Sequence, residues 1–556
     1  MDLAGPKLSD LSKALMQEKM TELFDENFAK YFWDKEWHFK SEGRALFYFH
    51  DITKTVVPYC YATSTTRILD EGLSYVKDYP SNPPKRFDSY MYQVVDLTQE
   101  LSQEHAGAIA LPDLFVNAAT FFKDLTDIKA QSYQIKNFFQ SMIFVFHRKI
   151  RPSGESPFMN VTVADAPTLE AVFQVTDKKE IEKIKLLQLL FIEELTRGLN
   201  GKPFRFPVTT MNFATEGGKL IDTPWLETVL PFLATGRLNI YISDDPRKFA
   251  SCCRLTNDLD LLMQMAGIDS FGNGGTRIGS HRVITLNLPA IVQDSLDSNR
   301  DKSSNFKRNA ALQAINMATD TACCALKAHR EVLRDCINAG LLKFFQAGWQ
   351  DLDRDFFSTV GIIGLWEAAQ AIMSSYDSLE DTMDAQEAIL RIINEEVNQA
   401  AKEHKMPINI EQIPAESAAV KLAKETGLEI LSNQYIPLWE DVDIVDRVVY
   451  AGRLDRLFTG GAITHLNIDK TISEKSCRKM IELAAKTGLT HFAFNPMYMI
   501  CENGHTTVGK KTKCPECGAK PADYLTRIIG YFVPLSKWNS GRKKEFKSRK
   551  FYKKMV

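Results

Sequence analysis

Two close pairs of soft metal ligands are the feature that most constrains the fold of this chain. Cys501 and His505 are spaced as C-x3-H, and Cys514 and Cys517 form a CPEC turn shortly after them. Two such pairs joined by a short loop suit a tetrahedral Zn²⁺ that is closed by four protein ligands. A set of free thiols is the alternative interpretation. The pattern predicts a structural zinc site with these four residues as ligands.

A glycine-containing apolar run follows the predicted zinc site. The run is RIIGY, which contains Gly530, and the segment WNSGRKKEF with Gly541 comes next. A glycine inside a strand-like run usually marks a bulge or a close approach of the backbone to another group. Glycine is also the one residue whose Cα carries no side chain that would obstruct planarisation.

The order of these motifs resembles the C-terminus of a known enzyme family. RIIGY, WN-x-G-(R/K) and a zinc cluster directly before them are similar to features of the anaerobic (class III) ribonucleoside-triphosphate reductases, which are glycyl radical enzymes. The resemblance implies that Gly530 stores a radical on its Cα, with Gly541 as the nearby competitor. It also implies a structural Zn²⁺ and an activating enzyme that uses S-adenosylmethionine and an iron-sulfur cluster.

Composition and charge narrow the class of protein. Hydrophobic residues make up 44% and charged residues 25% of the 556 residues, and the formal net charge is -2. These values are typical of a soluble globular protein and argue against nucleic acid as a partner. No run is long and apolar enough for a signal peptide or a membrane span. Ten cysteines without a secretory segment predict reduced thiols in the cytoplasm. Three of them lie in one helical run and are interpreted as core or surface thiols: Cys323, Cys324 and Cys336.

Three further cysteines are candidates for catalysis. Cys60 lies in the β-prone stretch around VVPYCYATS, where a plain core cysteine is the alternative. Cys252 and Cys253 are adjacent in FASCCRLTNDLD, so their side chains should point in different directions. The family carries its hydrogen-abstracting cysteine immediately before an arginine, which implies Cys253. The resemblance also implies that Cys60 is the second active-site cysteine.

Two other segments resemble substrate-binding parts of the family. RPSGESPFMNVTV reads as a turn that enters a strand, and Asn160 and Thr162 of that strand are candidates for substrate contact; strand packing explains them equally well. IEQIPAESAAVKLAK marks a helix start, whose free amides suit triphosphate oxygens, and Pro414, Ala415 and Glu416 are the candidates for substrate binding there. Glu367 also opens a helix, where an acidic residue complements the macrodipole, and stays unassigned.

The resemblance runs from about residue 40 to the C-terminus and carries the expected fold. It implies an α/β fold: a ten-stranded α/β barrel of two half-barrels with a central finger loop, followed by a zinc-ribbon-like segment and the glycyl radical loop. We expect three domains: an N-terminal helical segment over 1–40 without a full ATP-cone, the catalytic barrel over 41–490, and a zinc-binding and glycyl radical domain over 491–556. Hydrophobic periodicity alone does not predict this barrel.

The activity implied is reduction of ribonucleoside triphosphates to 2′-deoxyribonucleoside triphosphates. The implied partners are dNTP and ATP specificity effectors, the activating enzyme and a second copy of the chain in a homodimer, with no membrane. Formate-using members carry a methionine shortly before the radical glycine, and this chain has none there. Formate and a thiol redox protein therefore both remain open as the reductant.

Two other classes of protein are weighed against this assignment. Another glycyl radical enzyme, of the acyltransferase or dehydratase type, would share the RIIGY chemistry but lacks the zinc knuckle beside it. A zinc-ribbon protein that binds nucleic acid through the basic tail GRKKEFKSRKFYKK would contact phosphates non-specifically. That second alternative leaves more than four hundred residues of enzyme-like sequence unexplained.

Overall fold

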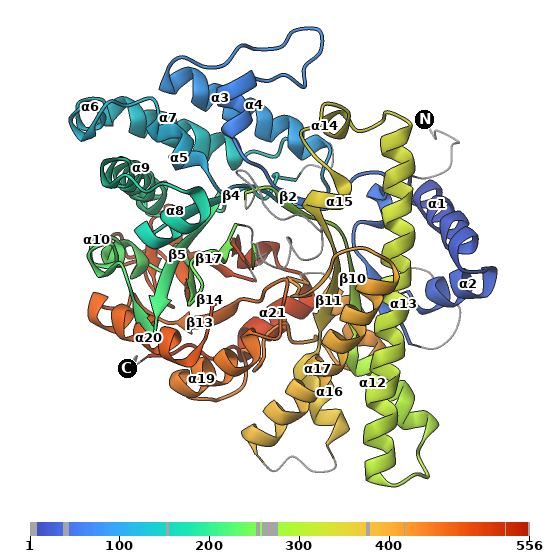
Figure 1. Cartoon of the computed structure of the whole chain (residues 1–556). Helices are drawn as coiled ribbons and strands as arrows, with labels where there is room; N and C mark the ends of the chain where they lie inside the picture. The colour runs from blue at the N-terminus through green and yellow to red at the C-terminus, as the bar shows by residue number, and fades with distance from the viewer. Residues whose placement is uncertain are drawn as a thin grey trace.

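The computed structural model describes residues 8–36, 44–151, 155–251, 256–257, 276–373, 378–415, 418–528 and 530–553. Two helices come first, α1 (Leu8–Leu23) and α2 (Glu26–Lys35). The carboxylate of Asp25 caps α2, because it accepts a hydrogen bond from the backbone N–H of Phe28 at 2.7 Å. α1 packs against α2 and α13 (Ser304–Asn338) on the outside of the molecule (Figure 1).

Ten strands in the described part of the chain follow one another around the central sheet, in the order β12-β11-β10-β2-β3-β4-β5-β7-β14-β13. They are β2 (Cys60–Ala62), β3 (Ile109–Leu111), β4 (Asn160–Ala164), β5 (Val208–Glu216), β7 (Asn239–Ser243), β10 (Ile278–Asn287), β11 (Phe356–Ile363), β12 (Ile408–Gln412), β13 (Thr464–Ile468) and β14 (His491–Pro496). Two short strands, β1 (Phe47–Phe49) and β6 (Lys219–Leu220), pair with β10 and β5 at the margins.

The ten strands form two parallel halves that run in opposite directions. β2, β3, β4, β5 and β7 are parallel to one another, and β10, β11 and β12 are parallel in the other half with β13 and β14. The halves meet in antiparallel pairs at β10–β2 and at β7–β14. A parallel bridge between Glu411 and Gly461 joins β12 to the chain just before β13 and closes the ring. The predicted ten-stranded α/β barrel of two half-barrels is confirmed.

The two faces of β4 carry side chains of different polarity. On β4, Val161 and Val163 belong to the large apolar core beneath the outer helices. Successive side chains of a strand point to opposite faces, so Asn160 and Thr162 point into the barrel. The inner face of β4 is therefore polar and its outer face aliphatic, whereas other inner positions, such as Ala62, Ala110 and Phe357, are apolar.

Helices surround the barrel, as Figure 1 shows. Those of the first half are α3 (Thr66–Glu71), α4 (Phe87–Gln103), α5 (Leu114–Ala119), α6 (Leu125–Ala130), α7 (Ser132–Phe146), α8 (Ala166–Phe173), α9 (Lys178–Arg197) and α10 (Thr223–Leu233). Those of the second half are α12 (Leu288–Ser298), α13 (Ser304–Asn338), α14 (Lys343–Gln346), α15 (Leu352–Asp355), α16 (Leu365–Ile372), α17 (Leu379–Glu403), α18 (Ala418–Ala423), α19 (Ile444–Asp455) and α20 (Glu474–Thr487). Parallel neighbours need such crossovers, and here the crossover helices cover the outer face of the barrel.

After the barrel the chain forms a small sheet in the order β16-β15-β17-β18. Its strands are β15 (Tyr498–Cys501), β16 (Thr506–Val508), β17 (Pro521–Arg527) and β18 (Phe532–Pro534), and α21 (Ser540–Ser548) follows. This segment returns to the middle of the molecule (Figure 1). The division into three domains stays a prediction; β14, at the start of the range 491–556, pairs with β7 and β13 in the barrel sheet.

Among the described residues, the helices lack the length and apolar character that a membrane crossing requires.

Candidate functional site

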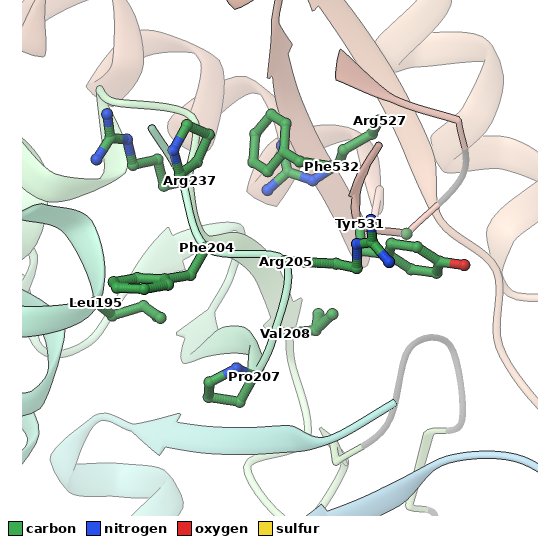
Figure 2. A pocket seen from close by; sticks show the side chains of 11 residues that line it. Leu195, Phe204, Arg205, Pro207, Val208, Arg237, Arg527, Tyr531 and Phe532 are labelled. Carbon is green, nitrogen blue, oxygen red and sulfur yellow. The ribbon is translucent and has the colours of Figure 1, made fainter. Parts of the chain in front are cut away.

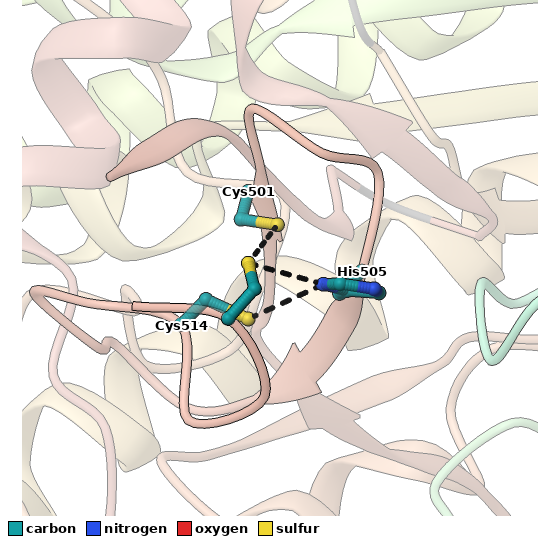
Figure 3. Close-up of side chains that lie close together, drawn as sticks. Cys501, His505 and Cys514 are labelled. Atoms are coloured by element: carbon teal, nitrogen blue, oxygen red, sulfur yellow. Dashed lines mark hydrogen bonds between the residues drawn. The ribbon is translucent and has the colours of Figure 1, made fainter. Parts of the chain in front are cut away.

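The four predicted metal ligands come together at one corner of the small sheet (Figure 3). Cys501 ends β15 and its Sγ lies 3.8 Å from the Sγ of Cys517. The Nδ1 atom of His505 lies 3.2 Å from Cys517 Sγ and 3.8 Å from Cys514 Sγ. A tetrahedral Zn²⁺ with bonds of about 2.0 to 2.3 Å separates its ligands by about 3.6 Å. The residues present therefore fit a structural zinc ion.

The two thiols of the CPEC turn differ in their electrostatic environment, and burial raises the pKa of Cys514. The backbone N–H of Ala519, assisted by Asn503 and His505, lowers the pKa of the Cys517 thiol to about 6. Thiolate is the form that binds Zn²⁺. Because β17 leaves the cluster and leads directly to Gly530, a metal here would fix the base of the predicted radical loop.

Replacing both Cys514 and Cys517 with serine should remove a tightly held zinc, about one ion per chain. The two thiolates supply half of the closed tetrahedron. Metal analysis after dialysis against a mild chelator measures the loss, and circular dichroism should show that the barrel helices persist. Cys477→Ser, a change at a thiol on α20 outside this cluster, is the matched control and should keep its zinc. A double variant that retains the ion would show that the ligands lie elsewhere.

Gly530 lies in the hairpin turn that joins β17 to β18, where Arg527 pairs with Phe532. It is buried and borders a cavity of about 10 Å³, roughly the volume that one water needs. Phe204, Arg205 and other residues that precede β5 form the facing wall, as Figure 2 shows. The Gly530 backbone is thus enclosed by protein.

The ring of Tyr531, the next residue, contacts the first half-barrel. Its centroid lies 4.9 Å from that of Phe206 and 5.8 Å from that of Phe158. The strand register places these two phenylalanines level with Cys60, at the edge where the parallel strands begin. Cys60 and Phe158 also pack in the same interior cluster. The predicted radical loop and the predicted second cysteine therefore lie at the same end of the barrel.

Cys60 has a defined environment. Its Sγ accepts a hydrogen bond from the backbone N–H of Ala108 at 3.2 Å. A Cβ on Gly107 would lie 2.5 Å from this sulfur, so only glycine there leaves room for the thiol. The buried guanidinium groups of Arg151 and Arg282 lie within electrostatic range of Cys60, and burial lowers their pKa, for Arg282 to about 10. Positive charge therefore surrounds a half-buried thiol.

Cys252 and Cys253 lie outside the described residues, but the chain that leads to them is held inside the barrel. The backbone N–H of Ala250 donates to Asn212 Oδ1 at 2.8 Å, and its carbonyl oxygen accepts from Thr162 Oγ1 at 3.4 Å. These interior side chains belong to β5 and β4. They hold Ala250 inside the barrel, two residues before Cys252. Sequence reasoning missed Asn212, whose signal is a polar residue on the inner face of an otherwise buried strand.

The two predicted substrate segments lie on different strands of the barrel, one on β4 and the other after β12. Asn160 donates to the carbonyl oxygen of Phe158 at 2.8 Å, which fixes the entry to β4. Pro414 and Ala415 follow β12 closely in the chain. Asn433 donates to the carbonyl oxygen of Pro414 at 3.0 Å. Ala415 adopts a left-handed φ of 49°, which is strained for a residue with a Cβ. Glu416 lies outside the described residues.

Glu367 supports this region from beneath. Its Oε1 accepts a hydrogen bond from the backbone N–H of Ser432 at 2.7 Å, next to the Asn433 that holds Pro414. Burial raises the pKa of Glu367 to about 7. A macrodipole role alone does not explain so buried a carboxyl group.

A buried ion network on α21 connects the radical loop with the predicted substrate segment. Arg549 donates to the carbonyl oxygens of Arg527 at 2.9 Å and Ile528 at 3.2 Å, directly before the hairpin turn. Arg542 donates to the carbonyl oxygen of Ala415 at 3.1 Å. Glu545 lies between the two arginines and pairs with both. Burial disfavours its charge, but the arginines outweigh burial and lower its pKa.

The network explains the motif WNSGRKKEF. Asn539 caps α21 by accepting from the backbone N–H of Arg542 at 2.8 Å. A Cβ on Gly541 would lie 2.8 Å from the methyl groups of Val420, so glycine is needed for α21 to pack on α18. Packing thus accounts for Gly541. Sequence reasoning missed the roles of Arg542 and Glu545, because charged residues in such a segment resemble a solvated tail.

Polar side chains on the second half-barrel were also missed. Ser280 Oγ lies 2.8 Å from Thr359 Oγ1, which donates to Asn409 Oδ1 at 2.8 Å. His50 Nε2 lies 2.8 Å from Thr285 Oγ1. Their signal in the sequence is alternation of polar with apolar residues in strands that are buried throughout.

Comparisons with known proteins agree with this geometry. The family model described as "Anaerobic ribonucleoside-triphosphate reductase" matches residues 10–552. No curated protein sequence matches the chain. Among solved structures, one described as "Anaerobic ribonucleotide reductase" is 28% identical with a TM-score of 0.83, covering 99% of this chain and 89% of its own. The Thermotoga maritima anaerobic ribonucleotide reductase in complex with dATP and CTP is also 28% identical, with a TM-score of 0.80 and coverage of 97% and 90%.

A more distant likeness separates the fold from the activity. A structure of 1,2-propanediol dehydration in Roseburia inulinivorans has a TM-score of 0.58, covers 86% of this chain and 69% of its own, and is 10% identical. That likeness concerns the fold alone, so the alternative of another glycyl radical enzyme is not favoured. The chain belongs to the anaerobic ribonucleoside-triphosphate reductase family and is an oxidoreductase that reduces ribonucleoside triphosphates.

Proposed function

We propose that this reductase stores its radical on Gly530 and passes it to Cys253, whose thiyl removes the 3′ hydrogen of the ribose. The 2′-hydroxyl then takes up a proton and leaves as water. Two electrons and a proton reach the sugar through Cys60 from the external reductant. Return of the 3′ hydrogen from Cys253 restores the thiyl and then the glycyl radical. The balance is one ribonucleotide, two electrons and two protons to one deoxyribonucleotide and one water.

The observation that carries this proposal is the shared position of the hairpin and of Cys60. Tyr531 packs on Phe158 and Phe206, which lie level with Cys60 in the strand register. A radical centre must be kept away from water and oxygen, and the neighbourhood of Gly530 has room for about one water. The anchored backbone of Ala250 supports entry of the Cys253 segment into the same interior.

The zinc ion is proposed to be structural, held by Cys501, His505, Cys514 and Cys517. Four protein ligands leave no open position for a reacting water. The ion would supply a rigid base for the hairpin. A radical S-adenosylmethionine enzyme is proposed to abstract the hydrogen from Gly530.

Substrate and effector sites belong to the same proposal. Asn160 and Thr162 would contact the substrate from β4, and the segment of Pro414, Ala415 and Glu416 would hold the triphosphate. The Thermotoga maritima structures contain CTP with dATP, and dATP in the specificity site. By similarity we propose that this chain binds a ribonucleoside triphosphate and dNTP or ATP effectors, and that it acts as a homodimer in the cytoplasm.

The test is an anaerobic turnover assay on the full chain. Protein activated by a family activase and S-adenosylmethionine should convert CTP to dCTP, with formate or a reduced dithiol protein supplied in parallel reactions. The productive reductant identifies the source of the two electrons. The source is either formate, which is oxidised to carbon dioxide, or the dithiol protein, which is oxidised to a disulfide. Activated protein that forms no deoxyribonucleotide with either reductant and with any effector would overturn the proposal.

A further inference from the structure

Three potential metal ligands of different kinds meet on the outer surface of the second half-barrel, away from the C-terminal cluster. Asp320 and Cys324 lie on α13, and His404 caps the C-terminal end of α17. Cys324 Sγ lies 3.8 Å from Asp320 Oδ1 and 3.7 Å from His404 Nε2. All three ligand atoms lie within 4.8 Å of one another. Figure 1 shows both helices on the outside of the barrel.

The local structure explains why these groups meet. Asp320 and Cys324 are four residues apart on one helix, so their side chains share a face. The backbone N–H of His404 donates to the carbonyl oxygen of Ala400 at 2.9 Å, which holds it at the end of α17. The ring of Phe24 packs edge-on against His404, with centroids 6.1 Å apart. The imidazole is therefore held from two sides with Nε2 toward the thiol.

We propose that Asp320, Cys324 and His404 bind a Zn²⁺ ion that joins α13 to α17. Bonds of about 2.0 to 2.3 Å to a thiolate, an imidazole and a carboxylate place these ligands about 3.6 Å apart around a tetrahedral ion. The observed separations to the sulfur agree with that spacing to about 0.2 Å. Asp320 is exposed, so the ion has access from solvent and the fourth position is left to water.

The charges around the site favour a cation. Asp320, Glu396 and Glu403 lie within electrostatic range of the thiol, whereas Lys327 is the basic group that acts on His404. Neutral imidazole is the form that binds a metal ion, and Nε2 of His404 lies toward the thiol. The set of a soft thiolate, an imidazole and one carboxylate suits Zn²⁺ better than Mg²⁺ or Ca²⁺, which prefer oxygen.

A nucleophilic Cys-His-Asp triad is the competing explanation, and two observations oppose it. Asp320 contacts the thiol and not the imidazole, whereas a triad needs the acid to orient the histidine. The carboxylates of Asp320, Glu396 and Glu403 also lie within electrostatic range of the thiol. A thiol in such surroundings is a poor nucleophile until a cation compensates the carboxylates.

The test is metal binding to the full chain, measured with Zn²⁺ and with Co²⁺ as a visible probe. Protein with its C-terminal cluster filled should bind one further ion, and bound Co²⁺ should show the thiolate charge-transfer band. Cys324→Ser should lose this ion and the band. His404→Gln and Asp320→Asn should each weaken binding by more than the roughly tenfold that a change in an outer-shell partner costs. Cys336→Ser, on the same helix and outside the cluster, is the matched control and should bind like the unmodified protein.

A second measurement uses the unmodified protein, so its result does not depend on whether the variants fold. In the unmodified protein, micromolar Zn²⁺ should slow alkylation of Cys324 at least tenfold, as mass spectrometry of the modified peptide shows, and should not slow alkylation of Cys336. Equal ion counts in unmodified protein and Cys324→Ser, or saturation only at millimolar Zn²⁺, would overturn the proposal. Because the site is remote from the radical loop, either result leaves the reductase assignment untouched.

Discussion

Replacing Gly530 with alanine should abolish the doublet that electron paramagnetic resonance detects after anaerobic activation, and turnover should fall below detection. A Cβ obstructs the planar arrangement that lets the two flanking peptide groups share the unpaired electron. Gly530 is also buried and borders a cavity with room for about one water, so the turn leaves little space for an added methyl group. In the unmodified protein, exposure to air after activation should cleave the backbone at Gly530.

Two other glycine variants serve as controls for this result. Gly217→Ala changes an exposed hairpin glycine with a φ of 57° and open space around it, so it should cost about 1 kcal/mol of stability and leave the doublet intact. Gly541→Ala should weaken the packing of α21 on Val420 but still permit the radical. A doublet that survives in Gly530→Ala and disappears in Gly541→Ala would reverse the assignment of the radical residue.

The sequence could predict the fold only through its motifs. Several strands of the barrel are only three residues long or carry apolar residues on both faces, so periodicity does not distinguish them from core helices. The resemblance at RIIGY and the cysteine cluster implied ten strands in two halves, and the pairing of β10 with β2 and of β7 with β14 confirms it.

The sequence could predict the parts of the site whose residues are close together in the chain. It could not predict the parts that join residues far apart in the chain. The four proposed ligands at Cys501 to Cys517 are close in sequence, so their spacing predicted the cluster that the structure forms. Arg542 and Arg549 appear in the sequence as part of a basic tail, yet they are buried and hold the backbone on both sides of the site. Their partners, Ala415 and Arg527, lie far away in sequence or offer only backbone oxygens, which leave no trace in residue identity.

The cysteines should separate the steps of the reaction. Cys253→Ala should still accept a glycyl radical at Gly530, because activation precedes transfer, but should release no isotope from the 3′ position of labelled substrate. Cys60→Ala should retain the thiyl and attack the 3′ hydrogen, then stall and release free base instead of deoxyribonucleotide. Electron paramagnetic resonance, 3′ isotope release and product analysis on the same samples measure the three steps.

Cys252→Ala is the matched control, because neighbouring residues in an extended chain present their side chains to opposite sides. Ala250 donates to Asn212 and accepts from Thr162, which fixes the backbone two residues before the pair. Cys252→Ala should therefore keep substantial activity. An inactive Cys252→Ala beside an active Cys253→Ala would reverse the pair and leave the family intact. If both single variants reduce nucleotides normally, the thiyl does not form in this segment. The hydrogen-abstracting group would then have to be sought near Cys60, where Arg151 and the N–H of Ala108 already surround a thiol inside the barrel.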